Sequence, residues 1–149
     1  MKLSTKGRYA LEIIADLAMH SDAEHLESLK NVAERRKLSE KYLERIIKAL
    51  KEAGLVVSVR GAHGGYHLGK EPKDITATMV LNAVEGELAP VECLTKDTDC
   101  GIDCDSCPTR DTWGAIWKEM LAVTDSVTIE DIVKTYQKSR NNFWKRVDI

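Results

Sequence analysis

The alternation of apolar and polar residues predicts three helices in the first third of the chain. Apolar side chains recur at helical spacing from about residue 5 to residue 20, and Ser4 or Thr5 can cap this first helix. A short second helix is expected after Ser28 and a third after Ser39. Gly54 is expected to end the third helix in the left-handed conformation. The third helix carries an apolar stripe at i, i+3, i+4 and i+7, made of Leu43, Ile46, Ile47 and Leu50.

The periodicity then changes to that of a β-hairpin. Residues 55–60 are rich in β-branched side chains and predict a strand, residues 61–65 predict a turn, and residues 66–68 resume an extended pattern. Three helices followed directly by a hairpin is the order of a winged helix-turn-helix. The predicted fold class is therefore mainly α with a small β-hairpin wing, in a DNA-binding unit over residues 1–75. In that geometry the third helix enters the major groove, and Arg60 on the wing lies near the neighbouring backbone or minor groove.

The second half, residues 76–149, has a different pattern. A loop containing cysteines spans residues 91–108, and residues 109–125 predict a long amphipathic helix. One more short helix is expected from Ile129 to Tyr136, and residues 141–146 have no clear assignment. The apolar side chains of the long helix are Trp113, Ile116, Trp117 and Met120.

Charge is distributed unevenly between the two halves. The net charge is -2, but residues 1–75 carry a net +3, residues 76–149 a net -5, and the window 30–60 a net +5. A basic segment in an acidic chain is either an electrostatic footprint for phosphate or a solvated helix face. No apolar run approaches the ~20 residues that span a bilayer, and the N-terminus resembles no secretory signal. We therefore expect no membrane contact and a cytoplasmic location, where thiols stay reduced.

Three separated blocks resemble one family of bacterial regulators. Residues 3–10 read LSTKGRYA, residues 38–44 read LSEKYLE, and residues 54–70 read GLVVSVRGAHGGYHLGK. Together they resemble the Rrf2 family from residue 2 to about residue 135. The resemblance implies a homodimeric winged-helix repressor or activator that binds a partly palindromic operator in double-stranded DNA. It also implies that helix 109–125 is the subunit interface.

The candidate DNA-binding residues lie on the third helix and on the hairpin. The resemblance places Ser39, Tyr42 and Glu44 in the recognition helix and Arg60 in the wing. Glu44 can accept a hydrogen bond from a cytosine amino group, or it can pair with Lys48 one helical turn on. The full predicted set is Ser39, Lys41, Tyr42, Glu44, Arg45, Arg60, His63 and Gly64.

All four cysteines fall within fifteen consecutive positions. They are spaced Cys93-x6-Cys100-x3-Cys104-x2-Cys107. Thiolates hold iron–sulfur clusters or zinc, and the spacing alone leaves both open. A permanent disulfide is disfavoured in a reducing compartment. No catalytic constellation or nucleotide loop is present, so we expect no enzyme. A small thiol or iron–sulfur redox protein is the rival from another class, because Cys104-x2-Cys107 is formally a redox motif.

The resemblance shifts the choice of cofactor. In the iron–sulfur branch of the family, three loop cysteines hold a [2Fe-2S] or [4Fe-4S] cluster, and Cys93, Cys100 and Cys107 match their order. Arg110 stands where that branch has a histidine, and Arg8 stands where the nitric-oxide-sensing branch has an acidic ligand. Cys104 is therefore the candidate fourth ligand. The cysteine-metabolism branch lacks this cysteine set. The alternative is a DNA-binding dimer with a structural zinc site.

Overall fold

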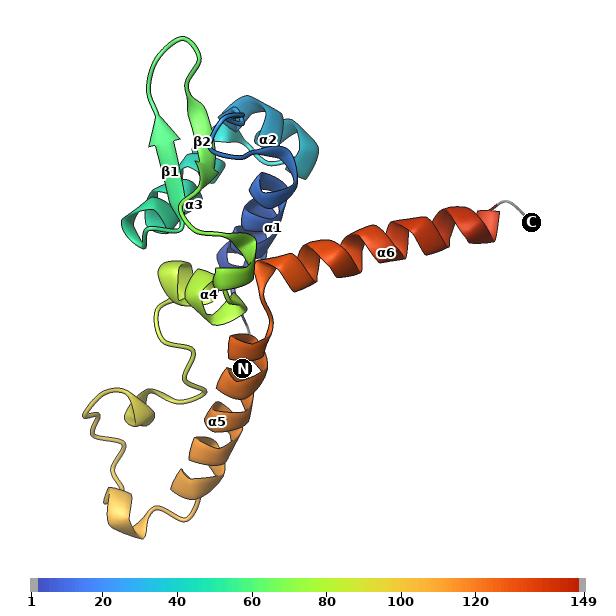
Figure 1. Cartoon of the computed structure of the whole chain (residues 1–149). Coiled ribbons are helices and arrows are strands. Elements are labelled where there is room, and N and C mark those ends of the chain that lie inside the picture. The colour runs from blue at the N-terminus through green and yellow to red at the C-terminus, as the bar shows by residue number, and fades with distance from the viewer. Residues whose placement is uncertain (1–2, 148–149) are drawn as a thin grey trace.

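The computed structural model describes residues 3–147, with side-chain surroundings through residue 141. It confirms the predicted fold class: helices dominate, and one two-stranded hairpin follows the third helix (Figure 1). None of the helices among these residues is both long and apolar enough to cross a membrane. The elements are α1 (Thr5–His20), α2 (Leu29–Arg36), α3 (Glu40–Glu52), β1 (Val56–Val59), β2 (Gly65–Leu68), η1 (Pro72–Asp74), α4 (Ala77–Glu85), η2 (Glu92–Leu94), η3 (Cys104–Ser106), α5 (Arg110–Ser126) and α6 (Ile129–Val147).

The predicted caps of α2 and α3 are confirmed. The Ser28 hydroxyl accepts a hydrogen bond from the Asn31 N–H at 3.1 Å, and the Ser39 hydroxyl accepts one from the Tyr42 N–H at 3.2 Å. Gly54 has φ +75° just after α3, as expected of a residue that ends a helix. The predicted apolar stripe of α3 is buried in the core; its members Leu43, Ile46, Ile47 and Leu50 are all at most 2% exposed.

The hairpin is a short antiparallel pair with a third segment at its side. Val56 pairs with Leu68 and Val59 with Gly65. Tyr66 of β2 also exchanges two backbone hydrogen bonds with Glu27, at 2.8 and 3.0 Å. A Cβ at Gly65 would come within 2.7 Å of the Glu27 carbonyl, so glycine permits this close approach. The segment before α2 is therefore attached to the wing.

The core does not end at residue 75. Helix α4, which was not predicted, packs against α1 and α3. Ile75, Val80 of α4 and Ile129 of α6 are fully buried in the same cluster as the α1 and α3 side chains. Thr76 and Thr128 form an isolated β-bridge that brings the start of α6 to the start of α4. The winged helix thus shares its core with residues from the second half of the chain.

The first turn of α1 is capped by a distant carboxylate. The Ser4 side chain makes no capping bond of its own, and its hydroxyl donates to Oε1 of Glu85 at the end of α4. The backbone N–H groups of Ser4 and Gly7 donate to the same oxygen at 3.1 and 3.0 Å. A Cβ at Gly7 would lie 2.5 Å from that oxygen, so the absence of a side chain makes room for it.

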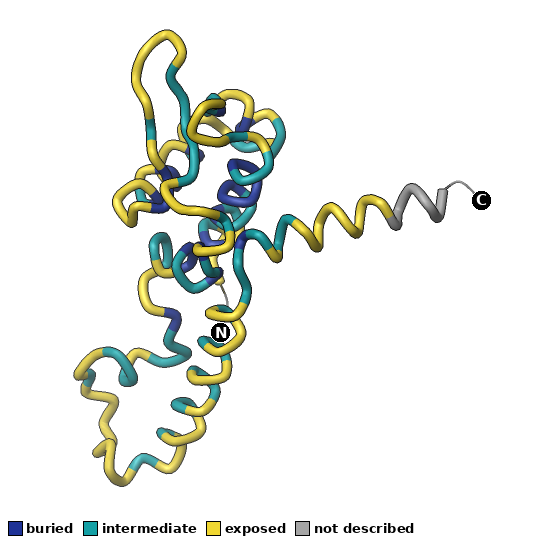
Figure 2. The backbone as a smooth tube through the Cα atoms, in the orientation of Figure 1, coloured by how far each residue is buried: buried dark blue, intermediate teal, exposed yellow. Residues whose placement is uncertain are grey.

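Helices α5 and α6 extend away from this core in different directions (Figure 1). No residue of α5 is buried, and only the first residue of α6 is buried in the part with described side chains (Figure 2). The prediction of a short last helix was wrong, because α6 runs for 19 residues to Val147 and includes the unassigned segment 141–146. Residues 137–146 contain no proline or glycine to end the helix.

Candidate nucleic-acid interface and cysteine loop

The side of α3 opposite its buried stripe is open to solvent. Lys41, Glu44 and Arg45 are exposed there, together with the capping residue Ser39. Tyr42 differs from these, because it is half-buried and its ring meets that of Tyr9 edge-on, with centroids 5.9 Å apart. The aromatic pair fixes the first turn of α3 against α1. Four of the five predicted α3 contacts are therefore accessible to a duplex, while Tyr42 is partly used in packing.

Glu44 is not held by the partner that helical spacing offers it. Both Glu44 and Lys48 are exposed, and no ion pair joins them in the described part of the chain. The carboxylate is thus available on the exposed α3 face. Unlike the basic side chains beside it, Glu44 can accept a hydrogen bond, as can Glu40 one turn earlier.

The tip of the hairpin carries the other predicted contacts. Arg60 and His63 are exposed in the loop between β1 and β2, which projects beyond the helices (Figure 2). A side chain at Gly64 would collide with the carbonyl of Val59, so this turn requires glycine for space. The role of Gly64 in the structure is therefore to shape the tip that presents Arg60 and His63.

A buried ion network that was not predicted from the sequence joins α1, α2 and the segment before α2. The Asp16 carboxylate of α1 is fully buried and receives the Arg35 guanidinium at 2.7 and 3.0 Å. Nε of Arg36 lies 3.2 Å from the same carboxylate. The other partner of Arg35 is Oε2 of Glu27, at 2.7 Å. These residues are 8 to 20 positions apart in sequence, and the helical position of Asp16 among apolar residues is the one signal that points to a compensated buried charge.

The network favours the ionised forms of Arg35 and Glu27. The Asp16 hydrogen bond raises the pKa of Arg35 further above its already high value, against the opposing effect of burial. Burial works against ionisation of Glu27, but hydrogen bonds from Asn31, Arg35 and the Ser28 backbone outweigh it and lower the pKa of that carboxyl. Arg35 and Glu27 therefore form an ion pair at neutral pH.

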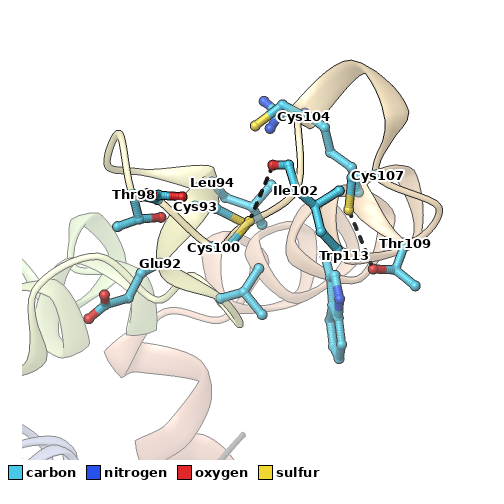
Figure 3. Close-up of a pocket in the computed structure, with 13 residues that line it drawn as sticks. Glu92, Cys93, Leu94, Thr98, Cys100, Ile102, Cys104, Cys107, Thr109 and Trp113 are labelled. Atoms are coloured by element: carbon cyan, nitrogen blue, oxygen red, sulfur yellow. Dashed lines mark hydrogen bonds between the residues drawn. The ribbon is translucent and has the colours of Figure 1, made fainter.

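The four cysteines line a single cavity. It has a volume of about 460 Å³ and lies between the loop and the start of α5 (Figure 3). Cys93 on η2 and Cys107 are half-buried, whereas Cys100 and Cys104 on η3 are exposed. Trp113 of α5 forms part of the wall. Residues that are up to 14 positions apart in the chain are thus brought to one space.

The thiols in this cavity are free, and one is biased toward thiolate. Cys100 Sγ lies 3.6 Å from the Ile102 carbonyl, and Cys107 Sγ lies 3.7 Å from the Thr109 hydroxyl (Figure 3). Hydrogen bonds from the Thr109 backbone and hydroxyl, followed by the backbone and charge of Arg110, lower the pKa of Cys107. No group of three or more histidine, cysteine or acidic side chains converges closely enough to hold a metal ion within residues 3–147. The structure collects the predicted ligands around one cavity without bringing them into coordination geometry.

The long helix α5 divides its apolar residues between two faces. Trp113 faces the cysteine cavity, and Thr124 accepts a hydrogen bond at 2.6 Å from Thr78 of α4. A second, open face is almost entirely apolar and consists of Ala115, Ile116, Glu119, Met120, Val123 and Thr124. Val123 is 62% exposed on this face. The predicted interface residues Ile116 and Met120 therefore lie on the open face, whereas Trp113 contributes to the cavity.

Comparison with known proteins agrees with this architecture. A family model named Rrf2, described as an iron-dependent transcriptional regulator, matches residues 3–135. The transcriptional regulator CymR of Bacillus subtilis is 43% identical over 132 residues, which are 89% of each chain. The solved structure of B. subtilis CymR, described as the global cysteine regulator, has a TM-score of 0.75 at 42% identity and covers 91% of this chain and 98% of its own. The structure of T. potens IscR also has a TM-score of 0.75, at 39% identity, and covers 93% and 90%.

These likenesses span both halves of the chain, and the relatives are named as transcriptional regulators and not as enzymes. The winged helix, the exposed α3 face and the projecting hairpin are the parts that such a regulator uses on DNA. The chain belongs to the Rrf2 family of DNA-binding transcriptional regulators.

Proposed function

We propose that the chain is a homodimeric regulator whose affinity for its operator is controlled by an iron–sulfur cluster in the cysteine loop. The observation that carries this proposal is the shared cavity of about 460 Å³, lined by all four cysteines of the chain. Four thiolates on one cavity are the soft, anionic donor set that iron–sulfur chemistry uses. The family description as iron-dependent supports the same assignment.

The residues fit such a group in chemistry, and all four cysteines lie on the same cavity. Cys93, Cys100 and Cys107 would hold it, with Cys104 as the candidate fourth ligand. The lowered pKa of Cys107 favours the thiolate that a ligand must supply. Gly101, with φ +80°, lies in the loop that has to close around the metal. When bound, the cluster would supply a redox-active group whose presence or charge reports the state of the cell.

The loop is placed so that its state can reach the DNA-binding elements. Thr109 and Arg110 at the start of α5 belong to the cavity wall, so closing the loop also fixes the first turn of this helix. Further along, α5 is bonded to α4 through Thr124 and Thr78. Helix α4 in turn packs on α1 and α3. A continuous set of packed elements therefore connects the cysteines to the α3 face.

Dimerisation would complete the regulator. The open apolar face of α5, with Ile116, Met120 and Val123, is the surface that a second copy would cover. A two-fold dimer presents two α3 helices, and such pairs bind half-sites about one turn of DNA apart. On each half-site, Lys41, Glu44 and Arg45 would face the major groove, and Arg60 with His63 would approach the adjacent backbone.

The test is the metal content and DNA affinity of protein purified without oxygen. We expect brown protein that contains iron and sulfide, and Cys→Ala changes at Cys93, Cys100 or Cys107 should abolish the visible absorption. Loss of colour at Cys104 as well would make it the fourth ligand. Cluster-bound and cluster-free protein should differ in operator affinity by about 1–3 kcal/mol.

Other outcomes are equally readable. Colourless protein with one zinc ion per chain would show that the loop holds a structural metal and not a cluster. Full iron and sulfide content without Cys93 would contradict the proposed ligand set. Identical operator affinity of the two forms would show that the cluster is not regulatory.

A further inference from the structure

The ion network of Asp16, Arg35, Arg36 and Glu27 joins the wing to α1 and α2. One arginine makes the connection. Arg35 of α2 has two partners: the buried carboxylate of Asp16 on α1 and Oε2 of Glu27, each at 2.7 Å. Glu27 in turn pairs with Tyr66 of β2 through two backbone hydrogen bonds. The chain of contacts from α1 to the hairpin therefore contains three side chains and one β-bridge.

The first link is fixed by the cost of burying a charge. Asp16 has no solvent-accessible side-chain surface, and a buried carboxylate without a partner is strongly destabilising. Arg35 meets it with two nitrogens, which holds the guanidinium plane in one orientation. Arg36 adds a second positive charge from the side of α2. Asp16 therefore holds Arg35 through two nitrogens, whereas Glu27 binds one of them.

The second link, from Arg35 to Glu27, connects the guanidinium to the wing. Both oxygens of the Glu27 carboxylate accept hydrogen bonds: Oε2 accepts from Arg35, and Oε1 accepts from the Ser28 N–H and the Asn31 side chain, each at 2.9 Å. A carboxylate held from both sides also holds the backbone of Glu27, which is the strand partner of Tyr66. Because Gly65 has no side chain, this backbone lies directly against the first residue of β2.

We propose that Arg35 and Glu27 are positioning residues for DNA binding, which set the angle at which the hairpin presents Arg60 to the duplex. Helix α3 and the wing must contact the DNA at the same time, so their relative orientation decides whether Arg60 reaches the backbone when α3 is in the groove. The tip itself has few restraints, because residues 60–63 are exposed, and its direction depends on the root of β2. This inference rests on the wing contact proposed above.

The experiment is a double-mutant cycle between the network and the wing tip. The probe is a duplex that carries the sequence selected by the wild-type protein from a random library. Arg60→Ala is measured in four backgrounds: wild type, Glu27→Gln, Arg35→Lys and the control Glu24→Gln. Gln keeps the shape of Glu27 but has no charge and only one acceptor oxygen, so it cannot accept from Arg35 and from Ser28 and Asn31 at once. Lys keeps a positive charge beside Asp16 but lacks the fork that reaches both carboxylates. Glu24 is an exposed carboxylate of the same segment and is outside the network.

We expect Arg60→Ala to weaken binding in wild type and in Glu24→Gln by the same factor. In Glu27→Gln and Arg35→Lys the factor should be at least about threefold smaller, since independent substitutions combine to within about a factor of two. The salt dependence gives a second readout. Loss of one phosphate contact lowers its slope by about one unit, and the network variants should show that loss with Arg60 still present.

The negative results are separable. If Arg60→Ala weakens binding equally in all four backgrounds, the network does not position the wing. If Glu27→Gln lowers the melting temperature but leaves the salt slope unchanged, its role is stability alone. If Arg60→Ala has no effect in wild type, the wing contact itself is wrong. Should Glu27→Gln fail to fold, as judged by circular dichroism, Arg35→Lys still decides the question.

Discussion

The two halves of the molecule differ in how fully a single copy of the chain buries their side chains. In the winged helix, α1 and α3 each bury at least four residues, and even a charged side chain, Asp16, is fully enclosed and paired. In α5 none of 17 residues is buried, and the preceding loop exposes two of its cysteines. The α1–α3 core is closed by residues of α4 and by the start of α6, whereas the cysteine loop and α5 leave thiols and an apolar face open. The metal and the second copy proposed above would cover these groups.

The largest test of this contrast compares isoleucines on α3 and α5. Ile46→Ala removes a fully buried side chain and should cost about 2–5 kcal/mol of unfolding free energy. Ile116→Ala on the open face of α5 should leave the unfolding of dilute protein nearly unchanged. Chemical denaturation followed by circular dichroism measures both. Equal losses would mean that α5 is as much a part of the monomer core as α3.

A charge on the open face of α5 should act on association and not on folding. Val123→Asp places two carboxylates near the axis of the proposed dimer and should weaken it about a hundredfold, or 2.7 kcal/mol. Sedimentation of the wild type and the variant over a range of concentrations measures this. Ala122→Asp is the matched control, because it puts the same charge on an exposed neighbour turned about 100° around the helix. If Val123→Asp leaves the dimer unchanged, the interface lies on another surface.

Glu44 tests the contrast from the DNA side. If its free carboxylate reads a cytosine, Glu44→Ala should relax the preference at one base pair by about 1–3 kcal/mol while overall affinity changes little. Selection from a random library before and after the change reveals it. Lys48→Ala is the control on the same face. If base discrimination is unchanged and stability falls slightly, Glu44 acts as the helical partner of Lys48 and not as a base contact.

The smallest expected effect is the acid sensitivity of the network. Since the folded-state pKa of Glu27 is lowered from 4.5, its ionisation stabilises the fold fully above about pH 4.5, and this contribution is lost as pH falls through the folded pKa. Glu27→Gln should therefore flatten the decline of melting temperature below pH 4.5 and leave its pH dependence at neutral pH unchanged. If the melting temperatures of the two proteins fall equally as the pH is lowered through the acid range, Glu27 contributes nothing to this decline.

Local signals explain most of what the sequence predicted. Apolar periodicity and capping serines located α2, α3 and the buried stripe, and the glycine cluster at 61–65 located the hairpin turn. The order of the cysteines indicated a common site, and the structure places all four on one cavity. Each of these depends on residues that are neighbours in the chain.

Features that depend on distant partners were not predictable in the same way. Asp16 and Arg35 are 19 positions apart, and Ser4 and Glu85 are 81 apart, so no local pattern relates them. Ser4 stands at the N-cap position of α1, but its hydroxyl donates to Glu85 and makes no capping bond to the helix. Helix α4 is a different case, because its local signals are present and were overlooked. It has an apolar stripe at i, i+3, i+4 and i+7, Thr76 caps it, and Gly86 follows it; the stripe consists of Ala77, Val80, Leu81 and Val84.

The carboxylate at the start of α1 also has a consequence for the order in which the chain becomes native during synthesis. Helix α1 is synthesised before the elements on which it packs, and Glu85, which caps its first turn, follows 81 residues after Ser4. Ile129, which closes the core over α1, follows later still. Domains usually fold as units once their sequence is complete. A nascent chain that ends before α4 therefore holds α3 on an unfinished support, and this support is completed only when the residues through the start of α6 have been made.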